Sequence, residues 1–131
     1  MLETRHDLDA EPTLEETLAA MRNMRSGTAG GQSGILPEMI LHGGNRLHHQ
    51  IHELIQVWRS GSVVSDWRDA IIVPIPKKGD LRSCNNWRGI SLLDVAGKLF
   101  ARIIQNRLQD IAEFVLPDSQ CGFRKAVGVL T

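Results

Sequence analysis

The feature that most constrains the fold is a change of hydrophobic period in the middle of the chain. Two short apolar runs, Ala70–Ile75 and Gly89–Leu93, lie on either side of a turn-forming KKGD segment. Their length and β-branched composition predict two strands that pair as an antiparallel hairpin with a basic tip. Because Pro74 and Pro76 lack backbone N–H donors, the first strand is expected to be short or to lie at a sheet edge.

Helical patterns precede this hairpin. Thr13, with Glu16 three residues later, forms a capping-box pattern at the start of an amphipathic helix that is expected to run to about Arg25. Four glycines between Ser26 and Gly34 then predict a loop, because glycine permits positive φ angles and close approach of another backbone segment.

Two more helices are expected. Pro37 stands at a first helical position, and the apolar stripe after it predicts a helix to about Ser60 that is either long or broken near Gly43-Gly44. From Asp94 the apolar residues again recur at helical spacing, and Pro117 stops the pattern. The whole pattern predicts an α+β fold that is mainly helical with a small antiparallel β-hairpin.

The charges are unevenly distributed along the chain. The whole chain has 15 basic and 15 acidic residues, but residues 1–16 hold six acids and one base. Residues 1–12 also lack periodicity, so we expect a disordered acidic N-terminus there. From Trp67 onward ten basic residues face six acidic ones, which fits a polyanionic partner or an ordinary solvated surface.

Several functional classes are excluded at this level. No apolar run approaches the ~20 residues of a membrane span, and the opening lacks the pattern of a secretory leader, so a cytoplasmic or nuclear protein with no membrane partner is expected. Cys84 and Cys121 lie outside any CxxC spacing, which argues against a zinc site or a disulfide framework. His48 and His52 are one helical turn apart but lack a third ligand, so no metal site is predicted.

The basic hairpin is the strongest candidate for a binding site. Lys77 and Lys78 lie at the turn and Arg88 lies at the start of the returning strand. Lysine supplies a compact charge and arginine a planar fork that can bind phosphate oxygens, so the three side chains could hold phosphates on one concave surface. The alternative is an ordinary solvated turn.

Four sequence blocks resemble those of a known family. They read DWRDAIIVPIPKKGD, CNNWRGISLL, GKLFARIIQNRL and LPDSQCGFRK, and they occur in this order after an upstream GGQSGILPEMI. In order and spacing they resemble the N-terminal third of the reverse transcriptase of non-LTR (LINE-type) retrotransposons. The resemblance runs from about Leu14 to about Lys125. Asn86-Trp87 stands where the family usually has Asn-Tyr, and Ser33 replaces a usual Asp.

The resemblance implies a partial reverse transcriptase domain over residues 13–125, formed by the fingers of a right-hand polymerase and the lead-in to its palm, followed by a truncated tail at 126–131. Lys77 or Lys78 and Arg88 would hold the triphosphate of the incoming nucleotide. A second group would lie beside the template and the nucleotide pocket: Gln120, Gly122, Phe123 and Arg124. The implied partners are an RNA or DNA template-primer, a deoxynucleoside triphosphate and a missing palm domain.

The catalytic carboxylates of such a polymerase have no counterpart in the sequence. The family transfers nucleotides at two metal ions held by palm aspartates, whereas this chain contains no Asp-Asp pair, and Asp94 and Asp118 are predicted to cap helix ends. No catalytic or metal-binding residue is therefore assigned, and Mg²⁺ is expected only in a complete polymerase. The chain is expected to be inactive alone. The alternative function is a non-catalytic helical interaction or nucleic-acid-binding module, in which the helices expected over Leu14–Arg25 and Pro37–Arg59 present apolar faces to a partner. Because the palm is missing, apolar surface that includes Phe100, Phe114 and Val115 is expected to be exposed.

Overall fold

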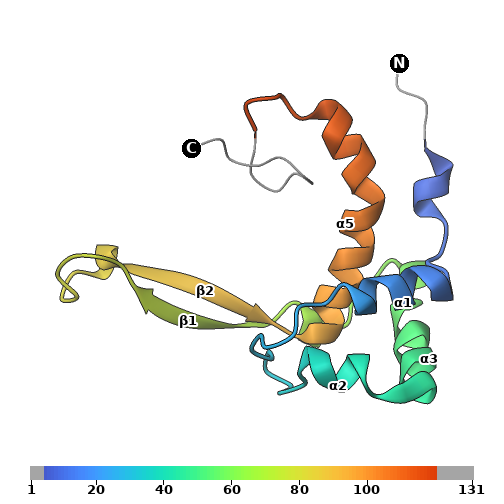
Figure 1. The fold of residues 1–131 in the computed structure, drawn as a ribbon, viewed down its shortest axis with the longest axis horizontal. Coiled ribbons are helices and arrows are strands. Elements are labelled where there is room, and N and C mark those ends of the chain that lie inside the picture. The colour runs from blue at the N-terminus through green and yellow to red at the C-terminus, as the bar shows by residue number, and fades with distance from the viewer. Residues whose placement is uncertain (1–4, 121–131) are drawn as a thin grey trace.

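The computed structural model describes residues 5–120 as a small helical body from which one long β-hairpin projects (Figure 1). The elements in chain order are η1 His6–Asp9, α1 Leu14–Arg22, α2 Pro37–Leu41, α3 Gly44–Ile55, α4 Val57–Ser60, η2 Ser65–Trp67, β1 Ala70–Pro76, η3 Cys84–Asn86, β2 Trp87–Leu93 and α5 Val95–Val115. The predicted α+β class is confirmed. None of the helices in the described part of the chain has the length and apolar character that a membrane span requires.

Helix α1 begins with the predicted capping box. The hydroxyl of Thr13 accepts a hydrogen bond from the backbone N–H of Glu16 at 3.2 Å, and the Glu16 carboxylate accepts one from the backbone N–H of Thr13 at 3.4 Å. These bonds satisfy two donors that a helix N-terminus otherwise leaves free. The helix ends at Arg22, earlier than its hydrophobic pattern predicts.

The predicted second helix is broken, as its glycines suggested. Only His42 and Gly43 separate α2 from α3, and Gly44, the first residue of α3, has a φ of +83°, which favours glycine. A Cβ atom on Gly43 would lie 2.7 Å from the carbonyl oxygen of Met39 and would also overlap the side chain of Leu47. The chain can therefore turn sharply here only because neither position carries a side chain.

The hydrophobic core lies entirely within the helical body. Its buried side chains come from four helices: Ala20 and Met21 of α1, Ile40 of α2, Ile51 and Ile55 of α3, and Val95, Leu99 and Ile103 of α5. Only the first half of α5 contributes to it, whereas Phe114 and Val115 near its end are 87% and 69% exposed. Phe100 was expected to be exposed but is partly buried. The centre of its ring lies 5.4 Å from that of Trp67 and 5.8 Å from that of Trp58.

The hairpin is confirmed, with β1 Ala70–Pro76 one residue longer and β2 Trp87–Leu93 two residues longer than predicted. β1 and β2 pair antiparallel along seven residues each, with Ile75 opposite Arg88. Beyond the last pair, the N–H of Lys77 donates to the carbonyl of Asn86 at 2.7 Å. Because hydrogen-bonded pairs alternate in an antiparallel ladder, this bond places Pro74 and Pro76 at positions whose missing N–H groups face away from the partner strand.

The root of the hairpin is held against α5 by close contacts. Trp67 packs on Gly97, where a Cβ atom would lie 3.2 Å from the indole ring. On the other strand, Gly31 of the glycine-rich loop lies so close to Leu93 and Asp94 that a Cβ atom would come within 2.6 Å of their backbone. The predicted close approach by the glycine loop is therefore real, and it occurs where β2 joins α5.

The acidic N-terminal segment carries contacts in the structure. Residues 6–9 form η1, Pro12 is buried, and the indole N–H of Trp58 donates to the carbonyl of Asp9 at 3.0 Å. Glu11 forms an ion pair with Arg59. The three-part domain division stays a prediction, but residues 5–12 lie against the helical body.

Candidate nucleic-acid interface

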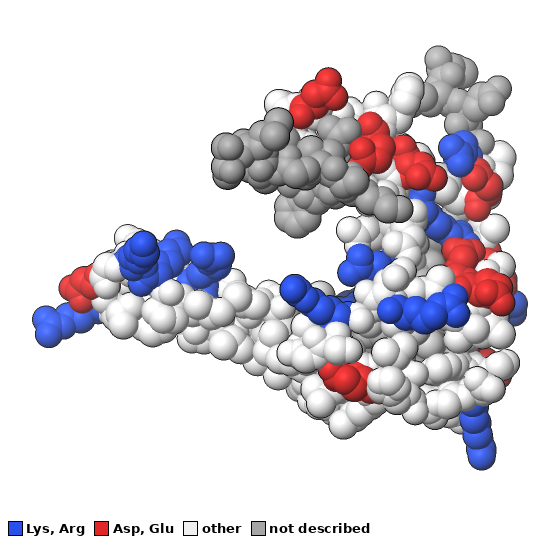
Figure 2. Space-filling view, in the orientation of Figure 1, with Lys and Arg blue, Asp and Glu red and all other residues white. Residues whose placement is uncertain are grey.

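The predicted phosphate-binding residues lie together at the end of the hairpin. Arg88 is opposite Ile75, and Lys77 follows two residues later, so alternation of side chains along a strand places Lys77 and Arg88 on one face. Lys78 follows in the turn. Figure 2 shows Lys and Arg side chains gathered over this tip, with acidic side-chain atoms beside them. The structure thus brings the three predicted cations close together in the fold.

The tip loop is ordered by side chains of the Asn-Trp block. The Asn86 amide donates to the carbonyl of Asp80 at 2.7 Å, and the Trp87 indole N–H donates to the carbonyl of Leu81 at 2.9 Å. The carboxylate of Asp80 accepts the backbone N–H of Arg82 at 3.0 Å, and Gly79 turns the chain with a φ of +118°. These bonds position the cations, a role that the sequence pattern alone does not reveal.

The strands of the hairpin are open to solvent. All strand residues are exposed except Leu92, which is half-buried. None of Lys77, Lys78 and Arg88 forms an ion pair with another residue in the range 5–120. Exposed, unpaired cations can meet phosphates directly, but water and salt screen the attraction.

The second predicted group is divided by the limits of the described chain. The backbone N–H of Gln120 donates to the carbonyl of Pro117 at 2.9 Å, in a turn just after α5. Gly122, Phe123 and Arg124 lie outside the described residues. Their assignment to a template and nucleotide pocket stays a prediction.

Asp94 has a different role from the predicted helix cap. It occupies the N-cap position of α5, but its side chain makes no capping bond and instead accepts the hydroxyl of Ser33 at 3.1 Å. An aspartate at position 33 would put two carboxylates in contact. Ser33 therefore donates a hydrogen bond to Asp94, where an acidic side chain would repel that carboxylate. This bond links the glycine-rich loop to the hairpin root.

A small acidic pocket surrounds this bond. It has a volume of about 290 Å³ and is lined by Gln32, Ser33, Asp66, Asp69 and Asp94. No local pattern in the sequence reveals this grouping, because Asp66 and Asp69 come from the segment before β1 and Asp94 follows β2. Within the described residues there is nevertheless no set of three His, Cys, Asp or Glu side chains placed to hold a metal ion.

The histidines of α3 are used in packing. His48 Nε2 lies 2.8 Å from the carbonyl oxygen of Ile40, and His52 Nδ1 lies 2.9 Å from the hydroxyl of Thr17, which is fully buried. Both side chains therefore link α3 to neighbouring helices, α2 and α1.

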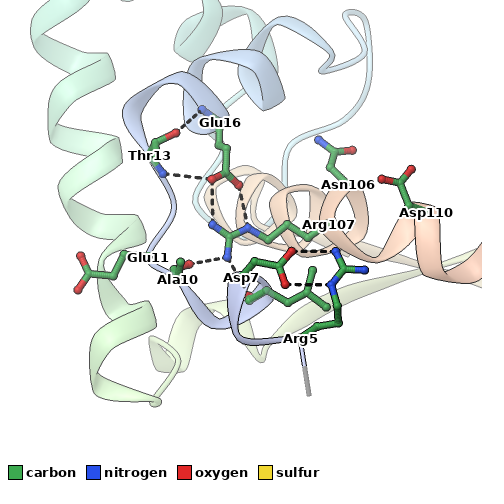
Figure 3. Close-up of a pocket in the computed structure, with 10 residues that line it drawn as sticks. Arg5, Asp7, Ala10, Glu11, Thr13, Glu16, Asn106, Arg107 and Asp110 are labelled. Carbon is green, nitrogen blue, oxygen red and sulfur yellow. Dashed lines mark hydrogen bonds and ion pairs between the residues drawn. The ribbon is translucent and has the colours of Figure 1, made fainter. Parts of the chain in front are cut away.

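Arg107 of α5 organises a second pocket, of about 350 Å³, at the N-terminal segment (Figure 3). Its guanidinium donates to both oxygens of Glu16 at 2.8 and 2.9 Å, to the carbonyl of Leu8 at 2.8 Å and to the carbonyl of Ala10. It also lies 5.0 Å from the centre of the Trp58 ring. Sequence analysis missed this arginine because its partners are about 90 or more residues away.

The ion pair changes the titration of both groups. Hydrogen bonds from Arg107 lower the pKa of Glu16, although partial burial of the carboxylate acts in the opposite direction. The same contact raises the pKa of Arg107. Glu16 thus joins the capping box of α1 to α5, and Arg107 is already fully engaged within the protein.

Two known proteins with similar sequences are both encoded by transposons. No family model matches the chain. The chain is 33% identical over 113 residues to the "Transposon TX1 uncharacterized 149 kDa protein" of Xenopus laevis, which covers 85% of this chain and 9% of that protein. It is 45% identical over 62 residues to the "Probable RNA-directed DNA polymerase from transposon BS" of Drosophila melanogaster, which covers 45% of this chain and 7% of that protein. The chain thus spans less than a tenth of the length of each relative.

Proposed function

Because this chain is a reverse-transcriptase-like segment related to transposon-encoded proteins, we propose that it holds nucleic-acid and nucleotide phosphates as the fingers of such a polymerase do. The observation that carries the proposal is the basic hairpin tip, where Lys77 and Arg88 share a face and Lys78 lies in the adjoining turn. The partners in this proposal are an RNA or DNA template-primer and a deoxynucleoside triphosphate.

The proposal includes no nucleotide transfer by this segment alone. In-line phosphoryl transfer at two metal ions needs several carboxylates directed at one point. The sequence has no Asp-Asp pair, and the described part of the chain offers no group of side chains arranged to ligate a metal. Mg²⁺ and the carboxylates that hold it would come from a complete polymerase.

The hairpin is tested by removing its three cations together. The triple variant Lys77→Ala, Lys78→Ala, Arg88→Ala is expected to bind single-stranded RNA about tenfold more weakly, with a salt slope that is smaller by about 2, because each lost phosphate contact removes ~0.7 from the slope. Fluorescence anisotropy over a salt series measures both quantities. Arg46→Ala, a change at an exposed residue of α3, controls for the loss of positive charge. An unchanged salt slope in the triple variant contradicts the proposal.

Polymerase activity is tested separately by primer extension. The purified 131-residue chain is expected to add no nucleotides to an RNA-templated DNA primer with either magnesium or manganese. A complete reverse transcriptase in the same buffer shows that the assay works. Incorporation above the background of a protein-free reaction would show that this chain contains a catalytic centre.

A second function, a non-catalytic interaction module, is favoured by one observation. Phe114 and Val115 are exposed at the end of α5. A mostly apolar groove of about 370 Å³ follows the same helix from its second turn onward and is lined by Ala101, Ile104, Gln105, Leu108, Gln109, Ala112 and Leu116. Exposed apolar surface of this kind is typical of a protein contact. This function would be favoured over the first if the hairpin variant and the control variant both bound RNA as the parent protein does and the chain associated in a concentration-dependent way.

A further inference from the structure

A second group of cations lies on the helical body, apart from the hairpin. A small pocket of about 160 Å³ lies between the end of α1, the glycine-rich loop and α5, and it is lined by Met24, Arg25, Thr28, Pro37, Lys98 and Arg102. Three of its six lining residues are basic and none is acidic. Neither the sequence patterns nor the proposed function assigns a role to this pocket.

The pocket is built on fixed parts of the fold. Pro37 is buried at the start of α2, and Met24 packs against the hydrophobic core. Lys98 and Arg102 are four residues apart on α5, so they project from the same side of the helix. The neighbouring Leu99 and Ile103 are almost fully buried, which holds this face of α5 in place.

The cations of the pocket are free to take an external partner. The three ion pairs found within residues 5–120 use Arg5, Arg59 and Arg107, and none of them uses Arg25, Lys98 or Arg102. The hydroxyl of Thr28 donates to the carbonyl of Arg25 at 3.1 Å, so its proton is already used within the pocket. An anion would therefore be held by the two guanidinium groups and the ammonium group.

The size of the pocket limits the ligand. Pockets that enclose a whole small molecule have volumes of roughly 300–1,000 Å³, about two or more times larger than this one. The pocket can receive a phosphate group but not a complete nucleotide. Two guanidinium groups and one ammonium group supply N–H donors that match the oxygens of a phosphate.

We propose that Arg25, Lys98 and Arg102 form a phosphate site for the backbone of a nucleic-acid strand, separate from the hairpin tip. Figure 2 shows Lys and Arg side chains on one face of the molecule, both over the hairpin tip and where the hairpin meets the helical body. A seven-residue strand at ~3.4 Å per residue separates these two places by roughly 20 Å. One strand passing over this face could contact both, which a free phosphate cannot do.

The double variant Lys98→Gln, Arg102→Gln tests the site with the whole chain. It is expected to weaken binding of a single-stranded RNA of about 12 nucleotides by about fivefold or more and to reduce the salt slope by about 1.4, because two phosphate contacts are lost. The charge-conserving variant Lys98→Arg, Arg102→Lys is expected to keep most of the affinity. Arg46→Gln serves as the matched control, and circular dichroism with thermal melting verifies that each variant folds.

The outcomes separate this site from the hairpin. If the pocket variant binds RNA with unchanged affinity and slope while the hairpin triple variant is weakened, the pocket proposal is wrong and the hairpin proposal stands. If instead the pocket variant is weakened while the hairpin triple variant binds RNA with unchanged affinity and slope, the hairpin proposal is wrong and the pocket proposal stands. Titration with inorganic phosphate, followed by the amide NMR signals of Thr28 and Lys98, distinguishes the sources: a shift with phosphate but none with RNA would overturn the strand as the ligand.

Discussion

Replacing Arg107 with Met is expected to lower the free energy of unfolding by about 2–3 kcal/mol, because the change removes the partner of Glu16 and the donor to two backbone carbonyls. Methionine keeps much of the packing volume, so the loss reports mainly the polar contacts. The Glu16 side chain is 36% exposed, and water therefore moderates the effect below that of a fully buried pair. Urea unfolding monitored by circular dichroism measures it.

The pH dependence of stability gives an independent measure of the same contact. Hydrogen bonds from Arg107 lower the pKa of Glu16 in the folded state below that of an ordinary glutamate, so the contact contributes its full stability above the pKa of the unfolded chain, and this contribution is lost as the pH falls through the lowered folded pKa. In the Arg107→Met variant this loss between neutral and strongly acidic pH should be smaller. Unfolding curves recorded at a series of pH values test the difference.

Arg102→Met provides the matched control on the same helix. Arg102 is exposed and forms no ion pair among residues 5–120, so its replacement is expected to change stability by less than about 0.5 kcal/mol. If the two methionine variants unfold at the same urea concentration, Arg107 does not join the N-terminal segment and α1 to α5 in the way described.

Replacing Gly31 with Ala is expected to destabilise the protein by about 1–3 kcal/mol and to lower Tm by several degrees. The added Cβ atom would lie 2.6 Å from the backbone of Leu93 and Asp94, and backbone atoms cannot rotate away as a side chain can. The loop must therefore withdraw from the hairpin root, which also stretches the bond between Ser33 and Asp94. Thermal unfolding measures the stability, and hydrogen exchange of the Leu93 amide measures how readily the hairpin root opens.

Gly89→Ala is the control for this change. A Cβ atom on Gly89 would meet only the Cγ2 methyl of Ile72 at 3.2 Å, and Ile72 is 69% exposed and can move. This variant is expected to unfold within about 0.5 kcal/mol of the parent protein. Equal losses for the two glycine variants would mean that the close approach of the loop to β2 and α5 does not limit stability.

The elements of the fold are predicted well from sequence where a local pattern sets them. The capping box at Thr13, the break at Gly43-Gly44 and the hairpin between the two β-branched runs all follow from residues close together in the chain. The length of α5 follows from its apolar spacing and the proline that ends it. Burial is predicted less well, since Phe100 is covered by two tryptophans that precede it by more than 30 positions.

The candidate sites divide in the same way. The positions of Lys77, Lys78 and Arg88 near the end of the hairpin follow from the pairing of two strands that are close in sequence, whereas their role in binding phosphate stays a prediction. The pocket of Arg25, Lys98 and Arg102 was not, because it forms only when α1 and the glycine-rich loop pack on α5. No local sequence pattern shows whether an arginine forms an ion pair. Arg107 forms one with Glu16, whereas Arg102 forms none among residues 5–120.

The sequence by itself determined the helices, the hairpin and its basic tip, because hydrophobic period, turn residues and capping act over a few neighbouring residues. It also carries the similarity to transposon-encoded proteins. Only the tertiary structure decided which charges are neutralised, where the glycine loop docks and which cations remain free for a ligand. The physical reason is that an ion pair or a backbone contact depends on distances of a few ångströms between segments as far as 99 residues apart, and packing alone sets those distances.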